Sequence, residues 1–215
     1  MAVDGQLPRT RASLLRLRQS LAEAREGHAL LERKREVLLR EVWTLMRDAG
    51  RHEKQVRDRF DAAHTALRAA RLDGGSEALR WALLAPSART TCRVELRNLM
   101  GVTLPSVELT VSPERLTTSA GGTPVALDEA RRRWLEVADV LAVWAETYGS
   151  AWRVAAELAR TQRRVAALEQ VLIPEYEAGI HAIEEALEES DREGFVRTKR
   201  VKARLEREGW EADRA

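Results

Sequence analysis

Hydrophobic residues recur at alternating steps of three and four through the first third of the chain. The series runs through Leu14, Leu17, Leu21, Ala24, His28, Leu31, Arg35, Leu38, Val42, Leu45, Ala49, His52, Val56, Arg59, Ala63, Ala66 and Ala70. Only His28, Arg35, His52 and Arg59 break the apolar pattern. A mean step of about 3.5 residues is typical of a coiled-coil seam. The pattern therefore predicts a long helix that packs against another helix.

The C-terminal part of the chain carries a second apolar stripe. It begins with Trp134, Val137, Leu141, Trp144, Tyr148, Ala151 and Ala155 and continues through Leu158, Val165, Leu172, Tyr176, Ile180, Ile183 and Leu187. Pro174 falls inside it and removes one backbone hydrogen bond of a helix. Because the apolar spacing resumes beyond Pro174, we expect a kink there rather than the end of the helix.

These two stripes predict three segments: an N-terminal helix over residues 8–72, a central segment over 73–126 and a C-terminal helix over 127–208. Thr10 or Ser13 is expected to cap the first helix, and Gly74 with Gly75 to end it. A short connection between two long helices makes them antiparallel neighbours. The predicted fold class is mainly α: one stalk domain built on a long antiparallel two-helix coiled coil.

The central segment has a different character. Residues 77–84 predict a short helix, and two β-prone stretches flank Met100 and Gly101. This pattern predicts a small β-hairpin, in which Pro105 takes an edge position or a bulge. The single cysteine, Cys92, is expected to be a small apolar residue packed within that hairpin.

Composition favours solvent-exposed helices over a compact globular core. Charged residues make up 33% of the chain and aromatic residues 5%, and the formal net charge is +2. One cysteine excludes an internal disulfide, and no apolar run reaches the roughly 20 residues that span a bilayer. We expect a cytoplasmic protein that is at most peripheral to a membrane. Trp134, Trp144 and Trp152 are expected to fill the core rather than bind a ligand.

The sequence predicts no chemistry of its own: no catalytic residue, no bound cofactor and no metal site. It contains neither of the glycine-rich phosphate-binding motifs, GxxxxGK[ST] and GxGxxG. His28 and His52 lie about 36 Å apart along one helix, too far to share a metal. The acidic run of Glu184, Glu185, Glu188 and Glu189 is read as a solvated face that pairs with neighbouring bases.

Basic residues gather near both ends of the chain. They are Arg9, Arg11, Arg16 and Arg18 at one end and Arg197, Lys199, Arg200, Lys202 and Arg204 at the other. Antiparallel helices would bring these ends together as one basic tip.

Several short segments resemble the D subunit of the V-type and A-type rotary ATPases. They are residues 8–11, 30–35, 98–102 with Pro105, 163–169 with Ile173 and Pro174, and 191–202. They occur in the family's order across nearly the whole chain. One departure is Ala166, which stands where the family commonly has asparagine.

The resemblance implies a non-catalytic central-stalk rotor component that links ATP hydrolysis or synthesis to proton or sodium transport. Its implied partners are the catalytic A and B subunits, the F subunit and the socket subunit on the proteolipid ring. The basic tip is then expected to enter the A/B hexamer. The hairpin residues Leu99, Met100, Gly101 and Val102 are expected to face the F subunit and the socket.

Two other classes are open. A coiled-coil adaptor or tether with no link to ATP would show the same seam, but it would not need the hairpin or the kink. A nucleic-acid binder could use the basic tip, although a net charge of +2 without interleaved aromatic residues is unusual for that class.

Overall fold

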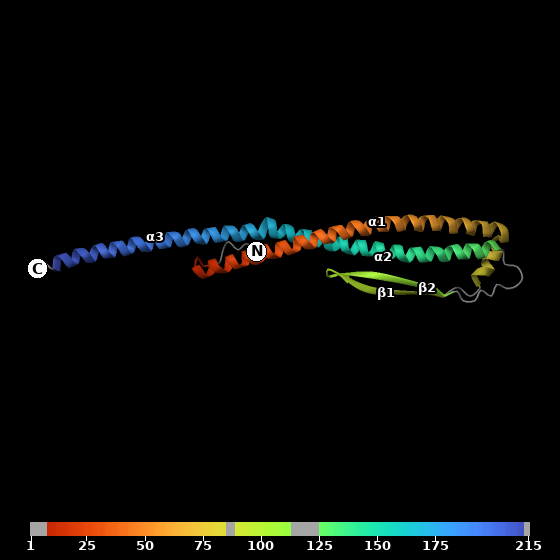
Figure 1. The fold of residues 1–215 in the computed structure, drawn as a ribbon, viewed down its shortest axis with the longest axis horizontal. Helices are drawn as coiled ribbons and strands as arrows, with labels where there is room; N and C mark the ends of the chain where they lie inside the picture. Colours follow the sequence, from red (N-terminus) through yellow and green to blue (C-terminus); the bar gives the residue numbers. More distant parts are fainter. Residues whose placement is uncertain (1–7, 85–88, 113–124, 213–215) are drawn as a thin grey trace. The chain divides into compact units, whose positions relative to one another are not determined.

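The computed structural model describes residues 8–84, 89–112 and 125–212 (Figure 1). In chain order these are helix α1 (Arg11–Leu84), strands β1 (Arg89–Leu99) and β2 (Val102–Ser112), helix α2 (Val125–Ala167), the π-helical segment η2 (Leu168–Leu172) and helix α3 (Ile173–Ala212). The two long helical stretches pack together and a small antiparallel hairpin separates them in the sequence. The predicted fold class is confirmed.

The chain forms two compact units. The first combines α1 up to Arg33 with the chain from Thr161 onward, and the second is the stretch from Lys34 to Arg160. Each unit holds an antiparallel helix pair, and the second also holds the hairpin.

Helix α1 begins at a capped turn and has one break. The Ser13 amide donates to Thr10 Oγ1 at 3.2 Å, which satisfies one of the unpaired amides of the first turn. Near the other end Gly75 has φ 70° and ψ 176°, so the helix kinks there and resumes to Leu84. Glycine adopts this positive φ without the Cβ clash that other residues meet. The predicted end at Gly74 and Gly75 and the short helix after it are both present.

In the first unit the buried apolar residues of α1 are Leu17, Leu21 and Ala24. Val165 and Ile183 are buried on the facing stretch. The two stretches approach closely where Gly179 leaves room for Leu17: a Cβ on that glycine would lie 3.5 Å from Leu17 Cδ1.

The second unit has the larger core. It consists of Leu38, Val42, Leu45, Ala151, Val154 and Leu158 from the two helices and Val102 and Leu104 from β2. Leu38 and Val154 are fully buried. The hairpin therefore completes the core that the helix pair begins.

The predicted seam of α1 is confirmed, whereas that of α2 is partly wrong. Leu141 and Tyr148 are 44% and 53% exposed, and the buried positions include Ser150 and Val154. Apolar residues at adjacent positions of α2 form two overlapping stripes on the helix surface. The stripe that is buried is the one with the smaller side chains. The larger ones lie beside it on the surface.

The hairpin closes at the predicted turn. Leu99 pairs with Val102, so Met100 and Gly101 form a two-residue loop, with φ of 50° and 84°. Two positive φ values are the mark of the type I′ turn, whose twist suits a hairpin. Asn98 Oδ1 also accepts a hydrogen bond from the Gly101 amide at 2.9 Å.

The helical path continues through Pro174. Just before it, η2 has π-helical geometry, and the Ile173 amide donates to the Leu168 carbonyl. Proline cannot donate to a carbonyl one turn earlier and its ring crowds that carbonyl, so the preceding turn widens. The helix was expected to kink at Pro174 without ending, and the irregularity found there is a π-helical turn. None of the five residues of η2 is buried.

Two packing predictions are wrong. Cys92 is exposed, because the face of the hairpin that carries it does not face the helices. Trp152 is 71% exposed, unlike Trp134, which meets Phe60 edge-on with ring centroids 5.3 Å apart, and Trp144, which stacks on Tyr148. A large aromatic ring on an amphipathic helix does not by itself indicate burial.

Across the part of the chain that the structure describes, no helix offers an apolar stretch long enough to cross a membrane.

Candidate functional site

Three basic residues of α1 pair with three acids of α3 in the first unit. Arg11 Nη2 lies 3.2 Å from Asp191 Oδ2, and Arg25 Nη2 lies 2.7 Å from Glu177 Oε1. Between them Arg18 pairs with Glu184 at 2.5 Å. Seven-residue steps on both helices place all three pairs on one side of the helix pair. Each pair is exposed and contributes roughly 0–1 kcal/mol, so their combined effect is to favour one antiparallel register.

This register separates the two basic stretches that were predicted to lie together. Arg11 faces Asp191, and Arg197 comes six residues later, about 9 Å further along the helix at 1.5 Å per residue. The bases of α1 therefore lie beside the acidic run, and the prediction of a single merged tip is corrected. The cause is that α3 runs past the start of α1.

The segment of α3 from Asp191 to Leu205 is exposed at every residue. It carries the predicted bases Arg197, Lys199, Arg200, Lys202 and Arg204. Arg197 pairs with Glu193 one turn away at 3.1 Å. Phe195 is 73% and Leu205 62% exposed, so the same segment also presents apolar side chains. Arg9 and Arg16, the other two predicted bases, are exposed near the start of α1.

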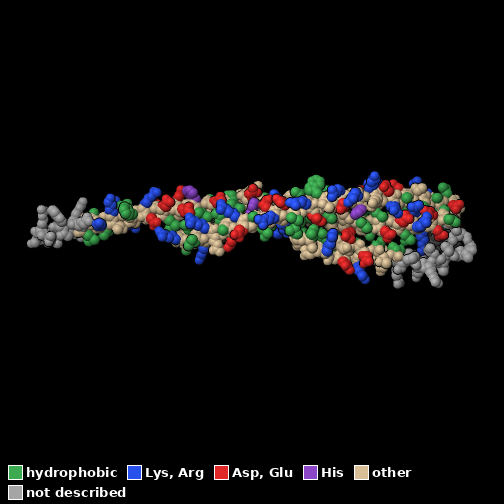
Figure 2. Space-filling model, in the orientation of Figure 1, with side chains coloured by type: hydrophobic (Ala, Val, Ile, Leu, Met, Phe, Trp, Pro, Cys, Tyr) green, Lys and Arg blue, Asp and Glu red, His purple; other side chains and the backbone are tan. Residues whose placement is uncertain are grey.

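The acidic run pairs with bases as predicted. Glu184 pairs with Arg18, Glu185 with His181, and both Glu188 and Glu189 with Arg192. Figure 2 shows acidic and basic side chains interspersed along the surface. This mixed-charge surface is typical of solvated helices.

The four predicted contact residues of the hairpin divide into two kinds. Val102 is buried in the core of the second unit, and Leu99 packs against that core. Met100 is 48% exposed and Gly101 is also exposed, because the turn holds them away from the helices. The tip can therefore meet another molecule through Met100 and the Gly101 backbone.

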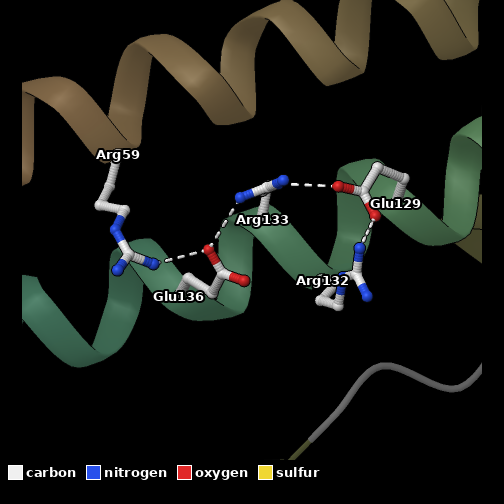
Figure 3. A network of polar contacts seen from close by, with 5 residues as sticks. All are labelled: Arg59, Glu129, Arg132, Arg133 and Glu136. Atoms are coloured by element: carbon white, nitrogen blue, oxygen red, sulfur yellow. Dashed lines mark hydrogen bonds and ion pairs between the residues drawn. The ribbon is translucent and has the colours of Figure 1, made fainter.

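A charged cluster joins the helices of the second unit (Figure 3). Arg59 of α1 pairs with Glu136 of α2 at 2.7 Å, and Arg133 lies 3.4 Å from the same carboxylate. Arg133 and Arg132 both also bind Glu129. The hydrogen bond from Arg133 is the main cause that holds the pKa of Glu129 below its ordinary value, and the same bond raises the pKa of Arg133.

Two seam histidines behave differently. His52 Nδ1 lies 3.1 Å from Thr147 Oγ1 across the helix pair, whereas the buried Nε2 of His28 has no hydrogen-bond partner among the described residues. Both are only partly exposed, as predicted for polar seam residues. Within the described ranges, no group of three or more His, Cys, Asp or Glu residues is placed to hold a metal ion.

Sequence reasoning missed the carboxylate that fixes the hairpin to α2. Glu146 Oε2 accepts a hydrogen bond from the Val107 amide at 2.7 Å and lies 3.4 Å from Ser106 Oγ. No sequence pattern marks a helix carboxylate as the partner of a strand amide. The α1–α3 pairs were missed too, although a signal exists: Arg11, Arg18 and Arg25 share the seven-residue spacing of Glu177, Glu184 and Asp191.

Comparison with known proteins gives one consistent family. The family model for the D subunit of ATP synthase matches residues 13–203. The chain is 34% identical to the D subunit of the A-type ATP synthase of Thermococcus gammatolerans, covering 92% of this chain and 94% of that one. It is 36% identical to the same subunit of Methanopyrus kandleri, over 92% and 86%. The D subunit of the V-type ATP synthase of Thermotoga neapolitana is 31% identical, over 92% and 98%.

Proposed function

The chain belongs to the family of ATP synthase D subunits, and we propose that it is the central shaft of the rotor in such a complex. As the shaft it transmits torque between the catalytic A/B hexamer and the membrane ion-translocating ring. This couples ATP hydrolysis or synthesis to proton or sodium transport. The shaft itself is non-catalytic and lies outside the membrane, as a peripheral part of the complex.

The observation that carries this proposal is the pairing of two long helical stretches. Helix α1 is helical from Arg11 to the break at Gly75, and the partner path runs from Val125 through η2 to Ala212. Interlocking side chains along a seam resist twisting better than one helix does, because rotation of either helix must displace packed neighbours. In the second unit, Leu38 and Val154 are such interlocked residues.

The surface supports rotation inside a bearing. Most charged residues are exposed, and many are paired within the chain, such as Arg18 with Glu184 and Arg192 with Glu188. Salt bridges at the surface are individually weak and exchangeable with water. A rotor that turns past its surroundings needs contacts of this strength, since tight binding at one angle would stop it.

We assign the exposed end of α3 to the bore of the hexamer. Its bases Arg197, Lys199, Arg200, Lys202 and Arg204 would meet carboxylates or helix C-termini that line this bore. Because Arg11 and Arg18 already pair within the chain, their part is to hold α3 in register. Arg9 and Arg16 are proposed to lie beside the opening of this bore.

The hairpin is proposed to face the F subunit and the socket of the complex. Met100 and Gly101 are the exposed contact points, and Leu99 and Val102 anchor the turn to the core. The competing class, a coiled-coil tether with no link to ATP, would use the same helices but would not require this anchored hairpin.

Reconstitution tests the proposal. The chain is mixed with purified A and B subunits, and the complex is weighed by native mass spectrometry. A shaft gives one copy per A/B hexamer and converts ATP hydrolysis into rotation of a bead fixed to the hairpin tip. A tether would leave the hexamer without a bound copy, and that result would reject the proposal.

Charge reversal tests the placement of the α3 end. Arg200→Glu with Lys202→Glu should weaken assembly with the hexamer, and more strongly at low salt, because exposed charges are screened within about 10 Å at 0.1 M salt. Reversal of Arg68 and Arg71, exposed on α1, is the matched control. Equal affinity of both variants would remove the assignment and leave membership of the complex standing.

A further inference from the structure

Strand β1 has one paired edge and one open edge. Among the residues that the structure describes, the sheet contains two strands, and β1 pairs only with β2, along all eleven of its residues. In the part of the chain that the structure describes, residues 90–98 are exposed at every position. An open edge of this length is a template for another strand.

The geometry of the turn tells which backbone groups of β1 are open. Leu99 and Val102 flank a two-residue loop, so this pair exchanges both ladder hydrogen bonds. Alternate residues then point their amide and carbonyl groups outward. On β1 these are Thr90, Cys92, Val94, Leu96 and Asn98.

The same alternation explains why Pro105 is tolerated. It pairs with Leu96, an outward-pointing position, so its missing amide costs no ladder hydrogen bond. The outward groups of β2 turn toward α2: the Val107 amide donates to Glu146 at 2.7 Å, and the Thr103 carbonyl accepts from Arg153 at 3.0 Å. The outer edge of β2 is thus occupied by α2, whereas no described residue pairs with the outer edge of β1.

The side chains of β1 divide by face, since successive residues of a strand point to opposite sides. Cys92, Val94 and Leu96 form an apolar row on one face, with Val94 56% and Leu96 66% exposed. The other face carries Arg93, Glu95 and Arg97, a row that reads basic, acidic, basic.

We propose that the open edge of β1 binds an extended segment of a partner protein as a third strand of the sheet. The partner segment alternates apolar residues with a charged row that reads acidic, basic, acidic. Its backbone bonds to Cys92, Val94 and Leu96, its apolar side chains extend the apolar row, and its charges face Arg93, Glu95 and Arg97. Main-chain bonds supply affinity and the alternating side chains supply specificity, as in other strand additions.

The charged row distinguishes this partner from a generic strand. A second copy of β1 can match these charges only when its register is shifted, because Arg93 lies opposite Arg97 when the pairing is centred on Glu95. Charges on both faces of β1 would protect this edge from aggregation. One face of β1 instead carries the exposed apolar row, which suits a partner strand with apolar side chains.

The test uses the full chain and a synthetic peptide of sequence Thr-Glu-Val-Lys-Val-Glu-Thr. Its charged row is the same in either strand direction, so it complements β1 whether it binds parallel or antiparallel. Amide NMR should show shifts at Cys92, Val94 and Leu96, and exchange of these amides should slow at least about fivefold. The charge-inverted peptide Thr-Lys-Val-Glu-Val-Lys-Thr should bind at least about fivefold more weakly, since three opposed pairs become like-charged.

Two variants sharpen the test. Arg93→Glu, Glu95→Lys and Arg97→Glu together should reverse the preference, so that the inverted peptide binds better; a partly unfolded hairpin cannot produce such a reversal. Val94→Pro removes one outward amide without touching the ladder and should weaken both peptides. Arg68→Glu on α1 is the control and should change neither.

Three results would overturn the proposal. One is equal binding of the two peptides, or binding of neither. Another is perturbation of amides outside β1. The third is pairing of two copies through β1 in sedimentation, which Val94→Pro would abolish. None of these outcomes depends on the rotor role, because the peptides probe the isolated chain.

Discussion

Lys34 on α1 and Glu157 on α2 form the least exposed ion pair between the helices among the described residues. Lys34 Nζ donates to Glu157 Oε1 at 3.0 Å, and the two side chains are 25% and 19% exposed. Partial burial strengthens the attraction between the charges, but it also removes water from them. Loss of either partner would leave the other charge poorly solvated.

A double-mutant cycle should measure this pair. We expect a coupling free energy of about 1 kcal/mol between Lys34→Ala and Glu157→Ala in urea unfolding. The same cycle on Arg11 and Asp191, which are 78% and 68% exposed, should give less than about 0.5 kcal/mol. Equal coupling in the two cycles would contradict the role given to burial.

Adjacent leucines of α1 should differ sharply in their contribution to stability. Leu38 is fully buried between α2 and the hairpin, whereas Leu39 is 44% exposed. Leu38→Ala should lower the free energy of unfolding by about 2–5 kcal/mol, because it deletes packed methyl groups and leaves a cavity. Leu39→Ala should change it by less than about 1 kcal/mol, and a similar loss at both positions would contradict the seam.

The sequence predicted the fold where local patterns determine it. The seam of α1 could be read directly, because its spacing of three and four holds from Leu14 to Ala70. The neighbouring apolar stripe of Leu39, Trp43 and Met46 ends after two steps. The turn at Met100 and Gly101 could be read for a similar reason, since glycine between two β-prone stretches favours a two-residue loop. Both are properties of neighbouring residues.

Features that depend on distant residues could not be predicted in the same way. Leu141 and Tyr148 suggested a seam position on α2 that small residues in fact occupy, because packing against α1 and the hairpin decides which stripe faces inward. The basic ends were paired wrongly, since the register of α1 on α3 is set by Arg11 with Asp191 and Arg18 with Glu184. The hydrogen bond from the Val107 amide of β2 to Glu146 is also a tertiary contact, so no local pattern predicts it.

The hairpin turn should be sensitive to substitution of its glycine. Gly101 has φ 84°, so Gly101→Ala should cost about 1–2 kcal/mol of strain. Gly50→Ala is the matched control: no atom lies within 4 Å of the added Cβ, and alanine in a helix should stabilise by about 0.5–1 kcal/mol. Thermal unfolding of the two variants should shift in opposite directions, and shifts of the same sign would argue against the turn.

The π-helical segment should open more readily than the helices on either side. Its five residues include no buried side chain, and its backbone hydrogen bonds join residues five apart instead of the four of an α-helix. Hydrogen exchange should therefore be faster at Leu168–Leu172 than around the buried Val165. Pro174→Ala restores an amide donor and should slow exchange in this segment; no change would mean that Pro174 does not cause the π-helical turn.

The Glu129 cluster should make the stability of the second unit depend on pH in the acid range. Because the pKa of Glu129 is lower in the folded chain than in the unfolded one, the ionised carboxylate stabilises the fold above the unfolded pKa. That contribution is lost as the pH falls through the folded pKa. The difference in unfolding free energy between the natural chain and Glu129→Gln should therefore be largest near neutral pH and shrink on acidification. Carboxyl carbon NMR should show the pKa of Glu129 rising toward its ordinary value in Arg133→Met, since that substitution removes the main hydrogen bond; an unchanged titration would assign the shift to another cause.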